Sequence, residues 1–406
     1  MKPRIGLLCA AAAILTITAC GDGGSKDASP RPPSNKATGA PIRIGLVNTE
    51  AAGLGFPTYR LGNQTAAAYI NDHLGGVNGR PIEYRVCKTQ GTPESAVDCA
   101  NQMVEAKVAF VQSTFELGLD AMLPILGAAK IPLVGHVAYS RQQETNPNTV
   151  FLGASIEAYF AGPLKFYADR GKKSITLFFS ERPGVKEWTD GLLKPVADKL
   201  GIRYQIVQYN QANPDWNVLA ASAMSGKPDV IAGPGLADTS CTALLTALRS
   251  VGFRGEIFLG NCTEFIKQAP GLAPGVHLNS DSWRYDAKTG TPPDKRKDFG
   301  LQYDLLKEAG HEDHAKTGGG GFSDTMTVHR VLSGIKGEIT GPAVLKAFKR
   351  TVGADTFAGP AISCDGSAWK GTTTCGKSLF FYEVGTDGKL SLSSNGPVDV
   401  SAFAPR

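Results

Sequence analysis

The chain has 406 residues, with 42 Lys and Arg against 37 Asp and Glu, which gives a formal net charge of +5. This small, scattered excess does not support a nucleic-acid-binding surface. Hydrophobic residues make up 42% of the chain, so we expect a globular protein, with two or three domains at this length. The eight cysteines point to an oxidising compartment or to a metal site.

The first residues have the layout of a secretory signal peptide. A basic start is followed by an uncharged apolar run over residues 5–17 and by small residues up to Cys20. Ile17-Thr18-Ala19-Cys20 resembles the lipobox of bacterial lipoproteins, which implies cleavage before Cys20 and a diacylglycerol on its sulfur. An ordinary signal peptide with an incidental cysteine is the alternative.

The segment after Cys20 favours the lipoprotein interpretation. Residues 21–40 are rich in Gly, Ser, Pro, Lys and Asp and carry almost no apolar side chain, which predicts a flexible linker. Loss of the signal peptide, residues 1–19, would lower the net charge from +5 to +3. We therefore expect a lipidated linker over residues 20–41 and a mature protein held at the extracytoplasmic face of the cell membrane by lipid.

From residue 42 the chain alternates short β-rich runs with amphipathic helical stretches. Continuous apolar strands separated by helices predict parallel sheets covered on both faces, which bind ligands at the carboxyl ends of their strands. The first series comprises strands at 42–47, 82–86, 108–111 and 131–134 and helices at 59–74, 93–106 and 118–129.

A second series of similar size begins after Phe151-Leu152-Gly153 and predicts a second α/β lobe. Its strands are expected at 175–179, 204–207, 229–232 and 256–259, and its helices at 157–170, 185–200, 216–224 and 240–251. Two such lobes suggest a working site between them. Further helices are expected at 294–309, 322–335 and 342–352, followed by a hairpin of residues 378–384 and 389–393 around Thr386-Asp387-Gly388.

The ordered sequence resembles the branched-chain amino-acid-type solute-binding proteins of ABC importers, whose relatives include the leucine/isoleucine/valine-binding protein. The resemblance rests on short motifs taken together and spans residues 42 to about 392. The motifs are Gly75-Gly76-Val77-Asn78-Gly79-Arg80-Pro81, Gln90-Gly91-Thr92-Pro93, Ser113-Thr114, Ile131-Pro132-Leu133-Val134, Leu248-Arg249-Ser250-Val251-Gly252-Phe253 and Phe357-Ala358-Gly359-Pro360.

The resemblance implies a Venus-flytrap, type I periplasmic binding protein fold: two doubly wound parallel-sheet lobes joined by a three-segment hinge. We expect the crossings near Ala154, Asp281 and Asp355. Lobe 1 would then comprise residues 42–154 and 282–355, and lobe 2 residues 155–281 and 356–406. A ligand that touches both lobes would stabilise a closed form, which a membrane permease would recognise.

The resemblance also implies ligand-binding residues on loops that follow the strands of lobe 1. By position these are Ser113 and Thr114 after one strand, Val137 and Tyr139 after the next, and Phe56 or Tyr59 as an aromatic wall. The alternative is helix capping for Ser113 and core packing for the aromatic residues.

In lobe 2 the sequence departs from amino-acid-binding members of the family. The position of their aromatic residue falls near Arg182, and the position of their acidic residue falls near Cys262. The nearest carboxylates for a ligand ammonium are Asp238, Glu264 and Glu181, so a free α-amino acid remains one possibility. Arg182 would instead suit a ligand with a second anionic group, or would lie on the surface.

Six cysteines remain once Cys9 is removed and Cys20 is lipidated. Their spacing predicts three local disulfides, and the absence of a Cys-x-x-Cys pair disfavours zinc. The expected pairs are Cys87–Cys99, Cys241–Cys262 and Cys364–Cys375.

These features predict a lipid-anchored solute-binding protein that captures a small polar or amphipathic ligand, such as an amino acid or a related carboxylate or amide. Its expected partners are that ligand, an ABC permease and the bilayer, with no nucleic acid, cofactor or metal. A receptor that signals to a membrane partner is the alternative. An extracellular enzyme finds less support, because no nucleophile, base and orienting residue can be assembled.

Overall fold

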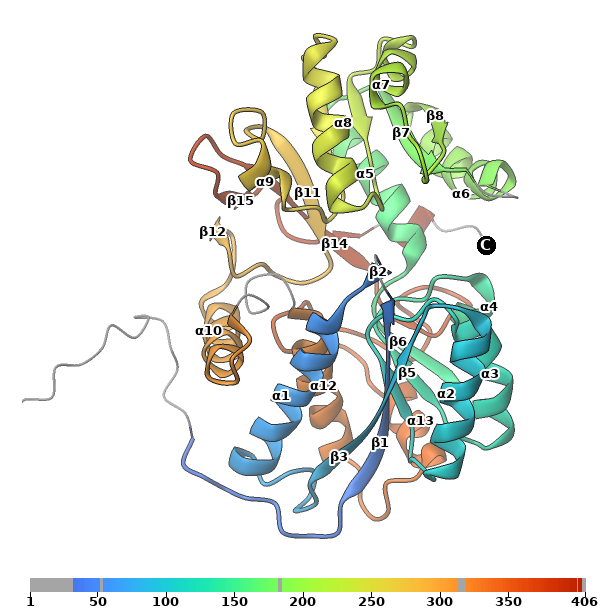
Figure 1. Cartoon of the computed structure of the whole chain (residues 1–406), viewed down its shortest axis with the longest axis vertical. Helices are drawn as coiled ribbons and strands as arrows, with labels where there is room; N and C mark the ends of the chain where they lie inside the picture. Colours follow the sequence, from blue (N-terminus) through green and yellow to red (C-terminus); the bar gives the residue numbers. More distant parts are fainter. Residues whose placement is uncertain (1–31, 52–53, 182–184, 313–318, 400, 404–406) are drawn as a thin grey trace, which may run out of the picture.

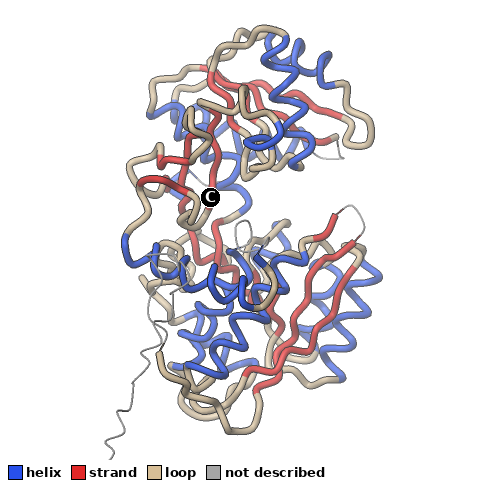
Figure 2. The backbone as a smooth tube through the Cα atoms, turned by 60° about the vertical axis from the view of Figure 1, so that its left-hand side comes forward, coloured by secondary structure: helices blue, strands red, loops and turns tan. Residues whose placement is uncertain are grey.

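The computed structural model describes residues 32–51, 54–181, 185–312, 319–399 and 401–403 (Figure 1). Two β-sheets with their helices form two lobes, which are joined along one side (Figure 2). Within the described ranges, no helix is both long and apolar enough to cross a membrane.

Lobe 1 is built on a seven-stranded sheet of order β13-β6-β5-β4-β1-β2, in which β3 also pairs with β1. Helices α1, α10, α12 and α13 share one apolar core with this sheet, and α2 and α3 share another. The strands are β1 (Ile42–Ala51), β2 (Leu54–Gly55), β3 (Ile82–Thr89), β4 (Val111–Ser113), β5 (Leu133–Gly135), β6 (Thr149–Ala154) and β13 (Thr374–Gly376). The helices are α1 (Pro57–His73), α2 (Pro93–Glu105), α3 (Leu119–Ala128), α4 (Arg141–Thr145), α10 (Pro293–Glu308), α12 (Gly319–Ser333) and α13 (Gly341–Lys349).

Lobe 2 contains a nine-stranded mixed sheet of order β12-β15-β14-β11-β10-β9-β7-β8, with β16 paired to β14. Helices α5 and α6 share one core with it, and α7, α8 and α9 share the other. The strands are β7 (Ser174–Ser180), β8 (Arg203–Tyr209), β9 (Val230–Ala232), β10 (Glu256–Phe258), β11 (Val276–Ser280), β12 (Ala287–Thr289), β14 (Ser378–Val384), β15 (Leu390–Leu392) and β16 (Val398–Asp399). The helices are α5 (Ile156–Asp169), α6 (Val185–Leu200), α7 (Trp216–Met224), α8 (Asp238–Ser250), α9 (Phe265–Gln268) and the 3₁₀ turn η1 (Ser401–Phe403).

The predicted α/β class of both lobes is confirmed, with one refinement in lobe 2. The β14–β15 hairpin that the Thr386-Asp387-Gly388 turn predicts adds to the sheet antiparallel to β11, so this sheet is mixed. The central strands carry buried apolar runs because helices cover both faces, as in β6, whose six residues are all buried.

Three segments pass between the lobes, and the third lies later than expected. The first follows Ala154, at the end of β6. The second runs from Asp281, directly after β11, to Pro293, where α10 begins; on the way β12 still pairs with β15 of the second sheet, so residues 287–289 belong to lobe 2 and not to lobe 1 as expected. The third passage is at Lys377, between β13 in the first sheet and β14 in the second. Asp355 stays in lobe 1 because Lys295 of α10 and Arg330 of α12 bind its carboxylate at 2.6 and 2.8 Å.

The passages fix which edges of the sheets face each other. Strand β6 runs into one passage and β11 into another, and β4, β5, β9, β10 and β7 run parallel to one of these two strands through their sheets. The carboxyl ends of the parallel strands of both sheets are therefore directed toward the opposite lobe.

Three disulfides close short loops: Cys87–Cys99, Cys241–Cys262 and Cys364–Cys375, which are the pairs expected from the spacing. The first joins β3 to α2, and the third ties the segment before β13 to that strand. Each limits the freedom of the unfolded chain more than that of the folded one.

The close pairing of β6 with β13 requires glycine at position 376. A Cβ at Gly376 would lie 2.6 Å from the carbonyl oxygen of Gly153, so Gly376→Ala is expected to lower the free energy of unfolding by about 1–3 kcal/mol. Denaturant titration measures the change. The matched control is Gly191→Ala in α6, where a Cβ meets nothing within 4 Å and stability should rise by about 0.5–1 kcal/mol. Equal changes in stability in the two variants would contradict the close approach of Gly376 to Gly153.

A buried carboxylate makes the first passage sensitive to pH. Burial raises the pKa of Glu144 to about 7, although the Ser155 hydroxyl donates a hydrogen bond to it at 2.5 Å. An acid whose pKa is raised in the folded state costs stability once it ionises, so stability should fall by about 3 kcal/mol as pH rises from about 4.5 to about 7.

Glu144→Gln keeps the acceptor for Ser155 and removes the titration. The variant should gain on the wild type as pH rises through this interval, which denaturant midpoints at several pH values will show. Parallel pH profiles of the two proteins would refute the assignment.

Candidate functional site

A row of aromatic side chains lies at the carboxyl edge of the first sheet. Phe56 follows β2, Phe115 follows β4 and Tyr139 follows β5, and the Phe115 ring centroid is 4.7 Å from that of Phe56 and 5.4 Å from that of Tyr139. Tyr59, on the first turn of α1, extends the row at 5.6 Å from Phe56. Phe56 is 38% exposed and Leu117 beside the row 40% exposed, so this edge offers an apolar surface toward lobe 2.

Polar groups predicted from the sequence lie in the same region. Ser113 and Thr114 at the end of β4 are both buried. The Thr114 hydroxyl donates to Asp324 of α12 at 3.1 Å, whereas the Ser113 hydroxyl has no partner among the residues that the structure describes. A buried hydroxyl without a partner costs free energy, so Ser113 is a candidate for a hydrogen bond supplied from outside the chain.

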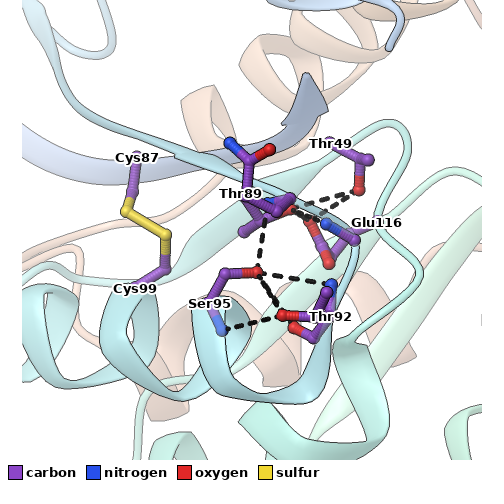
Figure 3. The surroundings of a disulfide bond; sticks show 9 residues. Thr49, Cys87, Thr89, Thr92, Ser95, Cys99 and Glu116 are labelled. Atoms are coloured by element: carbon purple, nitrogen blue, oxygen red, sulfur yellow. Dashed lines mark hydrogen bonds between the residues drawn. A yellow bond between two sulfur atoms is a disulfide. The ribbon is translucent and has the colours of Figure 1, made fainter. Parts of the chain in front are cut away.

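A second buried carboxylate braces the loop that carries Phe115. Glu116 accepts hydrogen bonds from Thr49 at the end of β1 and from Thr89 at the end of β3 (Figure 3). It also accepts one from the backbone N–H of Gly118. The Cys87–Cys99 bond lies beside this network and holds β3 against α2 (Figure 3). The loops that follow β1, β3 and β4 are thereby fixed relative to one another before any ligand binds.

The site meets the hinge at His136, which follows β5. Its Nδ1 lies 2.8 Å from Asp324 of α12, and its Nε2 lies 2.8 Å from Asp281, the first residue of the second passage. Burial alone would lower the pKa of His136, but the carboxylates of Asp324 and Asp281 outweigh it and hold that pKa well above its usual value. One imidazolium therefore bridges lobe 1 and the second passage.

The Tyr159 hydroxyl and Gly153 complete this cluster. Tyr159 of α5 bonds to Asp281, and burial raises the pKa of Tyr159 well above its usual value, so its phenol stays protonated. A Cβ at Gly153 would lie 2.7 Å from Asp281 Oδ2, which leaves glycine as the residue that fits. A cavity of about 40 Å³, the volume of one or two waters, lies behind the cluster and is lined by His136, Asp281 and Asp324.

The cluster is an ion pair and not a metal site. Both imidazole nitrogens face carboxylates, which leaves no lone pair for a cation. No group of three or more His, Cys, Asp and Glu in the described part of the chain could hold a metal ion.

Lobe 2 contributes a different surface. Asp238, at the start of α8, accepts hydrogen bonds from the backbone N–H groups of Thr263 and Glu264, and Glu264 lies 3.8 Å from Lys267. These contacts give Asp238 a structural role in joining the loops after β9 and β10. Arg182 lies outside the described residues.

Aromatic side chains are also present at the carboxyl edge of β7 in lobe 2. Phe160 of α5 stacks on Phe179 of β7 with centroids 5.0 Å apart, and a Cβ at Gly235 would lie 3.7 Å from the Phe160 ring. The sequence indicated no aromatic residue near Arg182. Phe160 supplies an aromatic side chain to the edge of β7 from a helix that lies earlier in the chain.

The structure therefore brings together Phe56, Tyr139, Ser113 and Thr114, while Val137 is buried beside them. His136, Phe115 and Asp324 were not predicted. His136 sits next to Val137, so the same positional argument could have found it. Asp324 is 188 positions away from His136 and carries no local signal.

Comparison with known proteins agrees with this architecture. The sequence model of the periplasmic binding protein family matches residues 41–389. Among solved structures, a substrate-binding protein of an ABC transporter from Aeropyrum pernix aligns with a TM-score of 0.71 at 18% identity, covering 90% of this chain and 99% of that one. No curated protein matches the sequence.

Two further structures differ in the ligand that their names state. The leucine-binding protein LivK of Thermotoga maritima has a TM-score of 0.69 at 16% identity, covering 89% of this chain and 99% of its own. A fatty acid ABC transporter substrate-binding protein from Thermomonospora curvata has a TM-score of 0.69 at 16% identity, covering 94% and 100%. These identities support the fold alone. Since the match covers most of the sequence, the chain belongs to the periplasmic binding protein family, a family of solute-binding proteins.

Proposed function

We propose that this protein is a lipid-anchored, extracytoplasmic solute-binding protein that delivers a small amphipathic ligand to an ABC importer. The observation that carries the proposal is the facing edge of lobe 1, where a partly exposed aromatic row lies beside a buried hydroxyl that lacks a partner among the described residues. Ligand contact with this edge and with lobe 2 would stabilise a closed form that a permease can recognise. The lipobox at Cys20 supports the anchor.

The chemistry of this edge favours a ligand with an apolar part and a carboxylate or amide. Phe56, Phe115 and Tyr139 would pack on the apolar part. The hydroxyl of Ser113 would donate a hydrogen bond to the polar part. Leucine and fatty acids, named for two structurally similar proteins, both have this division into a carboxylate and an apolar chain. An amino acid or a related carboxylate or amide is the proposed class.

The first test is a thermal-shift screen of amino acids, aromatic acids, fatty acids and amides, followed by calorimetry on the ligands that stabilise the protein. Ser113→Ala is expected to weaken the binding of the best ligand about tenfold, because it removes a hydrogen-bond donor. It should leave the melting temperature of the free protein unchanged. Phe56→Ala should also weaken binding.

Val251→Ala serves as the control, because Val251 is 36% exposed at the end of α8, which returns the chain to the amino-terminal ends of the strands, away from the facing edge. Unchanged affinity in both Ser113→Ala and Phe56→Ala would move the ligand elsewhere. The absence of any stabilising compound in the screen would count against solute binding itself.

The second test concerns the His136 bridge. His136→Gln should lower the free energy of unfolding by about 2–3 kcal/mol near pH 6, since it leaves two carboxylates without their cation. A histidine whose pKa is raised in the folded state contributes its full stability below about 6.5 and loses it as pH rises through the folded value. The difference between wild type and variant should therefore shrink in alkaline solution.

His329→Gln is expected to show the opposite dependence of stability on pH. Burial lowers the pKa of His329, so its contribution to stability should grow as pH rises toward 6.5. Denaturant midpoints across pH measure both variants. A wild-type-to-His136→Gln difference that does not vary with pH would refute the bridge.

A further inference from the structure

A groove lies at the end of lobe 1 opposite to the candidate ligand site. It is bounded by the start of β1, by the turns that follow α2 and α3, and by the start of α13, and its volume is about 690 Å³. These are the amino-terminal ends of the parallel strands, so a whole sheet separates this groove from the aromatic row. The proposed ligand site does not use it.

All the charged residues that line this groove are basic: Arg43, Arg80, Lys107 and Lys130. Arg43, Lys107 and Lys130 are exposed, and none of the four forms an ion pair with a carboxylate in the described ranges. Glu83 lies opposite Arg43 in the β1–β3 register and compensates part of its charge, so the two lysines carry most of the field. Such a cluster attracts polyanionic surfaces.

The backbone at the two lysines is unusual. Lys107 and Lys130 follow α2 and α3 with φ of 51° and 58°, the left-handed region in which glycine is the common residue after a helix. A lysine there gains from the helix dipole, but that accounts for one cation at each helix end and not for the arginines opposite. Arg80 donates to the carbonyl oxygens of Ala40 and Pro41 at 2.8 and 3.2 Å, and so forms a wall of the groove from the entering chain.

We propose that this basic groove faces the bilayer to which the protein is anchored and binds anionic lipid headgroups. The proposal rests on the lipid anchor at Cys20 and not on the identity of the transported ligand. The segment from Cys20 to Pro32 spans at most about 40 Å when fully extended, which keeps lobe 1 within reach of the membrane surface. A single lipid signal gains markedly from a second, electrostatic one.

The apolar floor of the groove agrees with this occupant. Ile42, Val108, Ile131 and Ile339 lie beneath the basic rim, each less than 10% exposed. A headgroup offers a phosphate for the rim and glycerol carbons for the floor, which a free inorganic anion does not. Screening by salt should weaken the contact, since the cations of the rim are solvated.

The test uses the full lipidated protein in phosphatidylcholine vesicles with and without phosphatidylglycerol. Labelling of lysine amines, read by mass spectrometry, should be slowed severalfold at Lys107 and Lys130 when phosphatidylglycerol is present, and high salt should abolish the protection. Lys227 is the matched control, because it is exposed, has φ of 47° and follows α7 in lobe 2. Its labelling should be the same in both vesicles.

Charge reversal gives a second readout. Lys107→Glu should reduce the protection of Lys130, and Lys130→Glu that of Lys107, whereas Lys227→Glu should change neither. Equal labelling at Lys107 and Lys130 in the two kinds of vesicle would overturn the proposal. Equal protection by inorganic phosphate in phosphatidylcholine vesicles would indicate a free-anion site instead, and protection that depends on protein concentration alone would indicate a second copy of the chain.

Flotation of the vesicles separates this proposal from the anchor. Protein that does not float with phosphatidylcholine vesicles is not lipidated, and the proposal of a lipid anchor at Cys20 is then wrong. The labelling experiment with excess phosphatidylglycerol vesicles still decides the groove in that case, because unanchored protein must bind them through its own surface. No protection there would refute headgroup binding by the groove.

Discussion

The imidazolium of His136 lies between two carboxylates at the junction of the lobes, and much of the architecture is arranged around it. Asp324 belongs to lobe 1, whereas Asp281 is the first residue after a central strand of lobe 2. The cluster carries one positive and two negative charges in a nearly buried place, which requires partners for the second carboxylate. Thr114 supplies one to Asp324 and Tyr159 supplies one to Asp281. Thr114 also belongs to the candidate ligand site, so that site and the hinge share a residue.

This shared residue connects ligand contact to lobe movement in physical terms. A ligand that bonds to Ser113 sits one residue from Thr114, whose hydroxyl fixes the Asp324 carboxylate. Any shift of Asp324 changes the bridge to Asp281 and therefore the second passage. Glu116 opposes movement on the other side of Phe115, because three hydrogen bonds hold its loop to β1, β3 and α3. Closure is thus expected to move the passages while the aromatic row stays rigid.

The sequence predicted the elements well because their signals are local. Buried apolar runs and amphipathic periods placed the longer helices and most strands of both lobes within a few residues, and short spacings identified the cysteine pairs. The sequence did not predict β6 and β11 as strands, although both lead into passages between the lobes. The third passage was misplaced because β13 is a three-residue strand, Thr-Cys-Gly, without an apolar pattern. It is a strand only because β6 offers its free edge. The His136 bridge joins residues from three distant parts of the chain, and no pattern within one segment could indicate it.

The parallel strands also set the orientation that headgroup binding would impose. The ten residues of β1 span about 33 Å, with the basic groove at their start and the loops of the ligand site at their end. A receptor resting on its groove would therefore hold the facing edges of the lobes roughly that far above the bilayer, open to arriving solute. Delivery to a permease requires the opposite arrangement, with both lobes turned toward the membrane. Electrostatic contacts screened by salt allow such a turn, whereas an apolar contact of the same area would resist it. A basic rim is thus better suited than an apolar patch to a protein that must both wait for its ligand and release it.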